Sequence, residues 1–71
     1  MITKTQIVQA LFELKQENLG MHWSAADIWA QTNNENFDRH IIAETIEKLE
    51  VLVNDGFVSV IRGPIDTYRF K

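Results

Sequence analysis

Apolar positions near the start of the chain recur at i, i+4 and i+7, the spacing of one face of an amphipathic helix. These positions are Ile7, Leu11 and Leu14. Thr3 and Gln6 have the spacing of a capping box, and Ile2 precedes them at the position of a hydrophobic staple. Gly20 is the residue expected to end the helix in a left-handed conformation. We therefore predict a first helix over about 4–18.

A second, shorter helix is predicted over about 25–31. Ser24 stands at its start, and Asp27 lies in its first turn, where a carboxylate stabilises the positive end of the helix dipole. The polar run from Thr32 to Asn36 then predicts a turn.

The longest apolar stripe predicts a third helix. Asp38, or Asn36 before it, would cap this helix, and the run Asn54-Asp55-Gly56 would stop it. The face expected to pack inward spans about 60° of a helix with 3.6 residues per turn. It consists of Ile42, Ile46, Leu49 and Val53, widened on one side by Ile41 and Leu52.

From Phe57 onward the pattern has the period of a strand. Residues 57–62 are mostly apolar and β-branched, and residues 67–70 alternate between polar and aromatic side chains. Between them, Gly63-Pro64-Ile65-Asp66 has proline where a turn requires φ near about −65°. We predict a β-hairpin that lies against the helices, because a lone hairpin is only marginally stable in water.

These elements predict one α+β domain over residues 1–71, with three helices followed by a C-terminal β-hairpin. A chain of this length has room for a single core. The residues predicted to form that core are Ile7, Leu11, Leu14, Ile28, Phe37, Ile42, Ile46, Leu49, Leu52, Phe57, Val60, Tyr68 and Phe70.

Composition argues against several classes of function. The chain has no cysteine, which excludes disulfides and thiolate zinc sites, and neither His22 nor His40 has a carboxylate at ligand spacing. Three glycines do not suffice for a nucleotide-binding loop, and neither Ser24 nor Ser59 has a histidine at a suggestive position. We therefore expect a binding module without cofactor or metal, and not an enzyme.

The chain also lacks the patterns of a membrane or secreted protein. No apolar run approaches the roughly 18 residues of a transmembrane span, and the first residues lack the charged region and apolar run of a secretory signal. We expect a cytoplasmic protein that does not associate with membranes.

The net charge of −3 is distributed unevenly. Acidic residues gather in the third predicted helix, and basic residues gather in the hairpin, where Arg62, Arg69 and Lys71 oppose only Asp66. Residues 35–56 carry two basic residues, Arg39 and Lys48, and six acidic ones, Glu35, Asp38, Glu44, Glu47, Glu50 and Asp55.

The run from Ile46 to Val58 resembles the end of the recognition helix in winged-helix domains. In both, a leucine, here Leu52, lies four residues before a glycine, here Gly56, and an apolar strand follows. The order of the elements is also similar over nearly the whole chain. This resemblance implies a winged-helix fold in which the hairpin is the wing.

The resemblance further implies a transcription-regulator-like protein that binds double-stranded DNA. In DNA-binding members the exposed half of the third helix enters the major groove and the wing contacts the backbone. Carried over to this sequence, the expected nucleic-acid-binding residues are Arg39, His40, Lys48, Arg62 and Arg69, with Ala43, Glu44 and Glu47 on the same helix face.

An acidic third helix opposes that interpretation, because carboxylates repel phosphates. The alternative is a protein-interaction module that uses the same fold. A continuous basic face joining Arg39, Lys48 and the wing would favour DNA, whereas an acidic helix flanked by apolar surface would favour a protein partner. Val8 and Phe12, one turn apart beside the core stripe, and Val51, on the polar face of the third helix, predict a partner interface and a homodimer.

Overall fold

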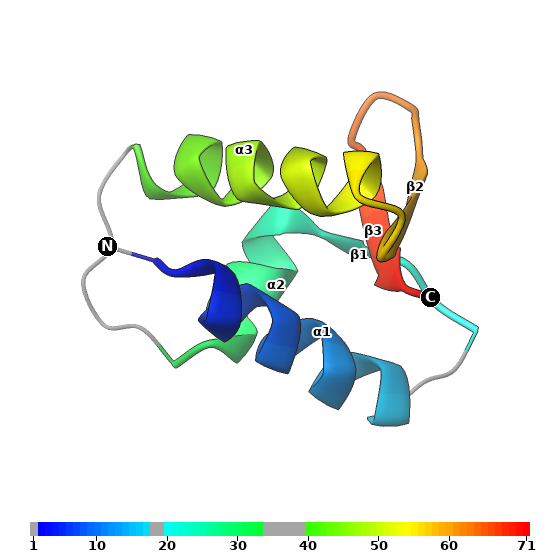
Figure 1. Ribbon diagram of the computed structural model, residues 1–71, viewed down its shortest axis with the longest axis horizontal. Helices are drawn as coiled ribbons and strands as arrows, with labels where there is room; N and C mark the ends of the chain where they lie inside the picture. Colours follow the sequence, from blue (N-terminus) through cyan, green and yellow to red (C-terminus); the bar gives the residue numbers. More distant parts are fainter. Residues whose placement is uncertain (1, 18–19, 34–39) are drawn as a thin grey trace.

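Three helices lie on one side of a small antiparallel sheet in the computed structural model of the chain (Figure 1). The structure describes residues 2–17, 20–33 and 40–71. The elements are α1 (Lys4–Glu17), β1 (Trp23–Ser24), α2 (Ala25–Gln31), α3 (Ile41–Asn54), β2 (Val58–Ile61) and β3 (Thr67–Phe70). This is the predicted α+β fold with its C-terminal hairpin, and the arrangement is consistent with that of a small winged-helix domain.

The sheet has a third strand that the sequence pattern did not predict. Its order is β1-β3-β2, with both pairings antiparallel, so the last strand of the chain lies in the middle. Trp23 of β1 pairs with Tyr68, which pairs on its other side with Val60. A strand of only two residues cannot show an alternating pattern, which explains why it was missed.

The N-terminal ends of the first two helices confirm the predicted capping residues. The Thr3 N–H donates to Gln6 Oε1 at 2.9 Å, and the Gln6 N–H donates to Thr3 Oγ1 at 3.1 Å. Ile2 and Ile7 are both fully buried, as a staple requires. At α2, Ser24 Oγ accepts the N–H of Asp27 at 3.2 Å.

The helix C-termini differ from the prediction at one of two glycines. Gly20 does not adopt a positive φ, so the predicted left-handed stop of α1 at this residue is wrong. Gly56 does, with φ of 84°, directly after the C-cap of α3. The N–H groups of Gly56 and Phe57 donate to the carbonyls of Val53 and Leu52, both at 3.0 Å, which is the pattern of a Schellman motif.

The core contains all the residues predicted for α1 and α2, but α3 presents a different face to it. The buried residues of α3 are Ile41, Thr45, Leu49 and Leu52. The buried face is thus rotated toward the flank of Ile41 and Leu52, and Ile46 is 40% exposed while Ile42 is only partly buried. Thr45 fits into the core because its hydroxyl donates to the Ile41 carbonyl at 2.7 Å.

Three further core predictions concern aromatic residues. Phe57 is 53% exposed, so its predicted burial is wrong, because it follows the Schellman turn and Val58 points inward in its place. Phe70, like Val60, is partly buried against the core and does not lie within it. Phe37, and the predicted caps Asp38 and Asn36, lie outside the described residues.

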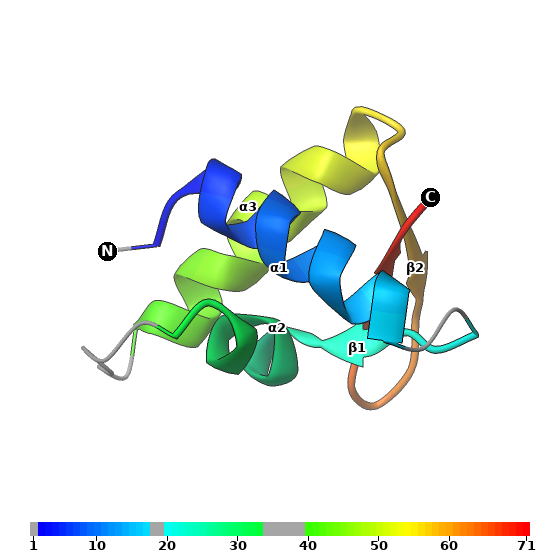
Figure 2. The same cartoon turned by 90° about the horizontal axis from the view of Figure 1, so that it is seen from below.

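The core is therefore enclosed by the three helices and the inner face of the sheet (Figure 2). Its fully enclosed apolar residues are Ile2, Ile7, Ala10, Leu11, Leu14, Ala25, Ile28, Ile41, Leu49, Leu52, Val58 and Tyr68. Within the described ranges, no helix has the length and apolar character that crossing a membrane requires.

Candidate functional site

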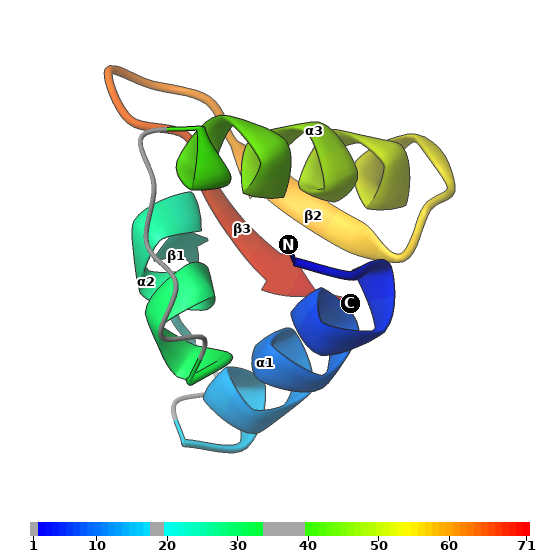
Figure 3. The same cartoon turned by 90° about the vertical axis from the view of Figure 1, so that its left-hand side faces the viewer.

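A groove of about 530 Å³ opens between the start of α2, the first half of α3 and the β2–β3 turn. Figure 3 shows these three segments meeting at one corner of the molecule. Most of the lining is apolar. The lining residues are Ser24, Ala25, Ala26, Ile42, Ile46, Gly63, Pro64, Ile65, Asp66 and Tyr68.

The rotated face of α3 is what makes this groove apolar. Because Ile41 and Leu52 take the buried positions, Ile42 and Ile46 are left at the edge of the core, where they line the groove. The turn supplies Ile65, which is 72% exposed. On the third side, Ala26 is too small to fill the space. An exposed apolar surface of this kind, bordered by polar residues, is typical of a binding site.

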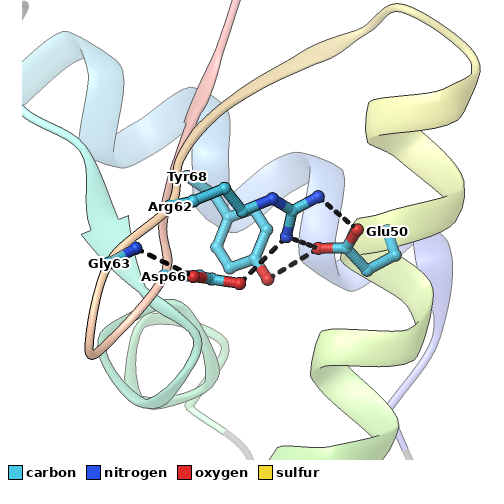
Figure 4. Close-up of polar contacts among 5 residues, drawn as sticks. All are labelled: Glu50, Arg62, Gly63, Asp66 and Tyr68. Carbon is cyan, nitrogen blue, oxygen red and sulfur yellow. Dashed lines mark hydrogen bonds and ion pairs between the residues drawn. The ribbon is translucent and has the colours of Figure 1, made fainter.

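A cluster of polar residues connects the wing, which is the β2–β3 hairpin, to α3 beside the groove (Figure 4). Arg62 donates from both terminal nitrogens to the two carboxylate oxygens of Glu50, each at 2.7 Å. Its Nη1 also donates to Asp66 at 2.9 Å, and the Tyr68 hydroxyl donates to Glu50 at 2.9 Å. The backbone N–H of Gly63 donates to Asp66 at 3.3 Å. The wing arginine is therefore held by two carboxylates of its own chain.

The cluster changes the acidity of its members. The hydrogen bond from Arg62 is the main reason that the pKa of Glu50 lies below its ordinary value. The hydrogen bonds to Glu50 and Asp66 in turn raise the pKa of Arg62 above its ordinary value. Burial first, and then the hydrogen bond to Glu50, raise the pKa of Tyr68 to about 12. The side chain of Arg62 is 54% exposed and that of Glu50 34%, so water screens the attraction and the pair contributes little to the stability of the fold.

Tyr68 is the only tyrosine in the chain, so phenolate absorbance in the near ultraviolet reports its titration alone. We expect a midpoint near 12 in the folded protein and near 10, the ordinary pKa of a tyrosine, in denaturant. A raised pKa means that folding favours the protonated phenol. The resulting contribution to the free energy of unfolding is fully present below pH 10 and is lost as the pH rises toward 12. Glu50→Gln should lower the midpoint toward 10, while Glu47→Gln should leave it unchanged. A folded-state midpoint near 10 would contradict the buried, bonded hydroxyl.

Of the predicted nucleic-acid-binding residues that the structure describes, Lys48, Arg62 and Arg69 do not lie together on one face. Arg39 lies outside the described residues, and His40 is exposed near the acidic side chains of Glu44 and Glu47. Lys48 and Glu50 are two positions apart on α3, which places them about 200° apart around the helix. Lys48 accordingly lies beside the start of α1, away from the Arg62 cluster.

Arg69 lies on the outer face of the sheet, paired in register with Ser59. Its Nε is buried without a hydrogen-bond partner among the described residues. Beside it, His22 Nε2 lies 2.9 Å from Ser59 Oγ, so the expectation that no histidine accompanies Ser59 is wrong. Nucleophilic catalysis would also need a group that orients the imidazole. Among the described residues no carboxylate is hydrogen-bonded to His22, and neither member of the pair lines the groove.

The predicted partner residues form two separate surfaces. Val8 is partly buried and lines a small apolar depression with Phe57 and Phe70, and Phe12 is 53% exposed one turn further along α1. Val51 is 46% exposed, but it lies beside Lys48 and Ile2 on another part of the surface.

Comparison of the chain with protein-family models, with curated proteins and with solved structures gives no match. The candidate site therefore rests on geometry alone. Its apolar residues were missed because the i, i+4 pair Ile42 and Ile46 was assigned to the core. An isoleucine in the turn, Ile65, was the one signal in the sequence that pointed to an exposed apolar surface at this groove.

Proposed function

We propose that this chain is a non-enzymatic protein-interaction module that binds an apolar segment of a protein partner in the groove between α2, α3 and the wing. The observation that carries the proposal is that Ile42, Ile46 and Ile65 line an open groove at the place where the resemblance implies a nucleic-acid-binding surface. The volume, about 530 Å³, is within the range of sites that receive a few apolar side chains.

Charge around the groove supports a protein partner over nucleic acid. Asp66 is the one charged residue among the described residues that line the groove. Three more carboxylates lie on α2 and α3, next to a lining residue or one turn after it: Asp27, Glu47 and Glu50. Among the cations that the structure describes, Arg62 adjoins the groove, and it is bound to Glu50 and Asp66. Phosphate binding depends on cations that neutralise the backbone. A surface with this charge disfavours a duplex and favours lysine or arginine on its ligand.

The partner segment that fits best is an amphipathic helix with apolar residues one turn apart and basic residues beside them. Apolar anchors at i, i+3, i+4 and i+7 are how helices bind in grooves. Basic flanks would face the carboxylates at the rim, which increases the association rate and selects against acidic segments.

A synthetic peptide of about four helical turns, with leucines at those positions and lysines elsewhere, tests this proposal. We expect backbone amide shifts in the nuclear magnetic resonance spectrum to concentrate on Ala26, Ile46 and Ile65. Ile46→Glu should weaken binding at least about tenfold, because it places a charge in the apolar contact. Val51→Glu is the matched control, since Val51 lies on the same helix, is 46% exposed and is not part of the groove lining.

The same peptide with glutamate in place of lysine should bind more weakly. A random-sequence DNA duplex at low salt provides the opposing measurement. Duplex binding that weakens when Arg62 and Arg69 are both replaced by alanine, with no shifts in the groove on adding peptide, would contradict the proposal and favour the nucleic-acid interpretation.

A further inference from the structure

A second apolar surface lies where α1 meets the open end of the hairpin. Lys4, Val8, Leu52, Phe57, Val58 and Phe70 line a depression of about 230 Å³ there. Phe57 is 53% exposed. Phe12, also 53% exposed, lies one turn after Val8 on the same side of α1. We call the surface formed by these residues the aromatic patch; it consists of Val8, Phe12, Phe57 and Phe70.

The surroundings of the aromatic patch are basic. Lys4 is one of its lining residues, Lys15 lies one turn after Phe12, and Lys71 follows Phe70. Among the described acidic residues, Asp55 adjoins the patch, with its carboxylate 3.7 Å from Lys4 Nζ. Glu13 faces a different surface, which it shares with Gln6, Gln31 and Asn33. The aromatic patch thus combines exposed apolar side chains with an excess of cations.

The groove and the aromatic patch are complementary in three respects. The groove has a volume of about 530 Å³, and the patch presents two phenylalanines, Phe12 and Phe57, that are each 53% exposed. Both are predominantly apolar at their centres. Carboxylates lie around the groove, where Glu50 and Asp66 share one cation, Arg62, whereas lysines surround the patch. These are also the properties of the basic amphipathic segment that the proposed function requires.

One chain cannot bring its own aromatic patch into its own groove. Phe57 and Phe70 lie at the open end of the β2–β3 hairpin, where Val58 pairs with Phe70, while the groove includes the turn at the other end. Figure 1 shows these two ends of the hairpin pointing away from each other. The contact must therefore join two molecules.

We infer that the groove of one copy binds the aromatic patch of a second copy, so that the protein associates with itself head to tail. This inference rests on the proposed function, since it identifies a partner for the same groove. Different surfaces of the two copies take part, so the contact is heterologous, and it produces rings or open chains of molecules. The self-paired dimer expected from Val8 and Phe12 would instead place lysines of one patch against lysines of the other.

Sedimentation and light scattering measure this association directly. We expect the average mass of the wild-type protein to rise above that of the 8.2 kDa monomer as its concentration approaches about 1 mM. Added salt should weaken the association, because it screens the lysine–carboxylate attraction. Ile46→Glu in the groove and Phe57→Glu in the patch should each remove it, while Val51→Glu should behave as the wild type.

Mixing the two deficient variants distinguishes the head-to-tail contact from other modes. Phe57→Glu retains an intact groove and Ile46→Glu retains an intact patch, so an equimolar mixture should form a complex of two chains and grow no further. A self-paired dimer predicts a different result, in which Ile46→Glu dimerises by itself and Phe57→Glu does not. That result would overturn the inference, as would a monomeric wild type throughout the concentration range.

Failure of this inference is separable from failure of the proposed function. Phe57→Glu has an intact groove and cannot self-associate through the patch, so its binding of the leucine–lysine peptide tests the groove alone. Peptide binding by this variant together with a monomeric wild type would retain the proposed function and reject the head-to-tail contact. Circular dichroism of each variant verifies that the substitutions, all at exposed positions, leave the helices intact.

Discussion

Leu49→Ala should leave most of the protein unfolded at room temperature. Leu49 is fully buried on α3, between the helices and the sheet. Removing a buried leucine side chain costs about 2–5 kcal/mol, since apolar contacts are lost and a cavity remains. A domain of this size buries only about 60% of its unfolded surface and has few kcal/mol of stability to lose. Thermal unfolding followed by circular dichroism would show the loss as a strongly reduced or absent transition.

Ile46→Ala is the matched control for this substitution. It removes a side chain of the same volume from the same helix, one turn away, but Ile46 is 40% exposed. We expect its melting temperature to remain close to that of the wild type. An Ile46→Ala protein as unstable as Leu49→Ala would show that α3 presents to the core the face predicted from the sequence, which contains both residues, and not the face that the structure shows.

The difference between these two faces of α3 shows which features of the fold the sequence pattern could predict and which it could not. Helix existence was predictable because local interactions determine it: the capping box of Thr3 and Gln6 and the Ser24 cap involve residues three apart. The bounds of α2 and β3 follow from similar local signals. The rotation of α3 depends on contacts between distant segments, which a periodic pattern does not contain.

Thr45 shows why the pattern misjudged the rotation. A polar residue counts against burial, yet the Thr45 hydroxyl is satisfied within its own helix by the Ile41 carbonyl. With Thr45 inside, Ile46 is displaced toward the surface. An apolar residue outside the core was thus assigned to it, and the groove that it helps to form could not be expected from the sequence.

The polar part of the site was also beyond the reach of sequence reasoning. The basic character of the hairpin suggested phosphate contacts from Arg62. Glu50 is twelve residues away from Arg62 in sequence, and no local rule pairs them. Once paired in the bidentate geometry, the guanidinium and carboxylate satisfy each other's hydrogen-bonding groups. The charge of the wing must therefore be judged together with the helix against which it packs.

Tyr68→Ala should be as damaging as Leu49→Ala, for a reason that links the fold to the groove. Tyr68 is 1% exposed on the central strand, pairs in register with both Trp23 and Val60, and contributes to the groove lining. Removing a large buried aromatic side chain costs about 3–5 kcal/mol. We expect loss of the cooperative thermal transition and of peptide binding together.

Tyr68→Phe separates the ring from the hydroxyl. The ring still fills the core, and Glu50 keeps both of its hydrogen bonds to Arg62, so only the bond from the Tyr68 hydroxyl is lost. A single hydrogen bond of this kind contributes about 0.5–1.5 kcal/mol, or somewhat more to a charged group. The Tyr68→Phe protein should therefore remain folded, melt slightly earlier than the wild type and bind the leucine–lysine peptide. If it unfolded like Tyr68→Ala, the polar cluster would be holding the wing in place far more strongly than its solvent exposure allows.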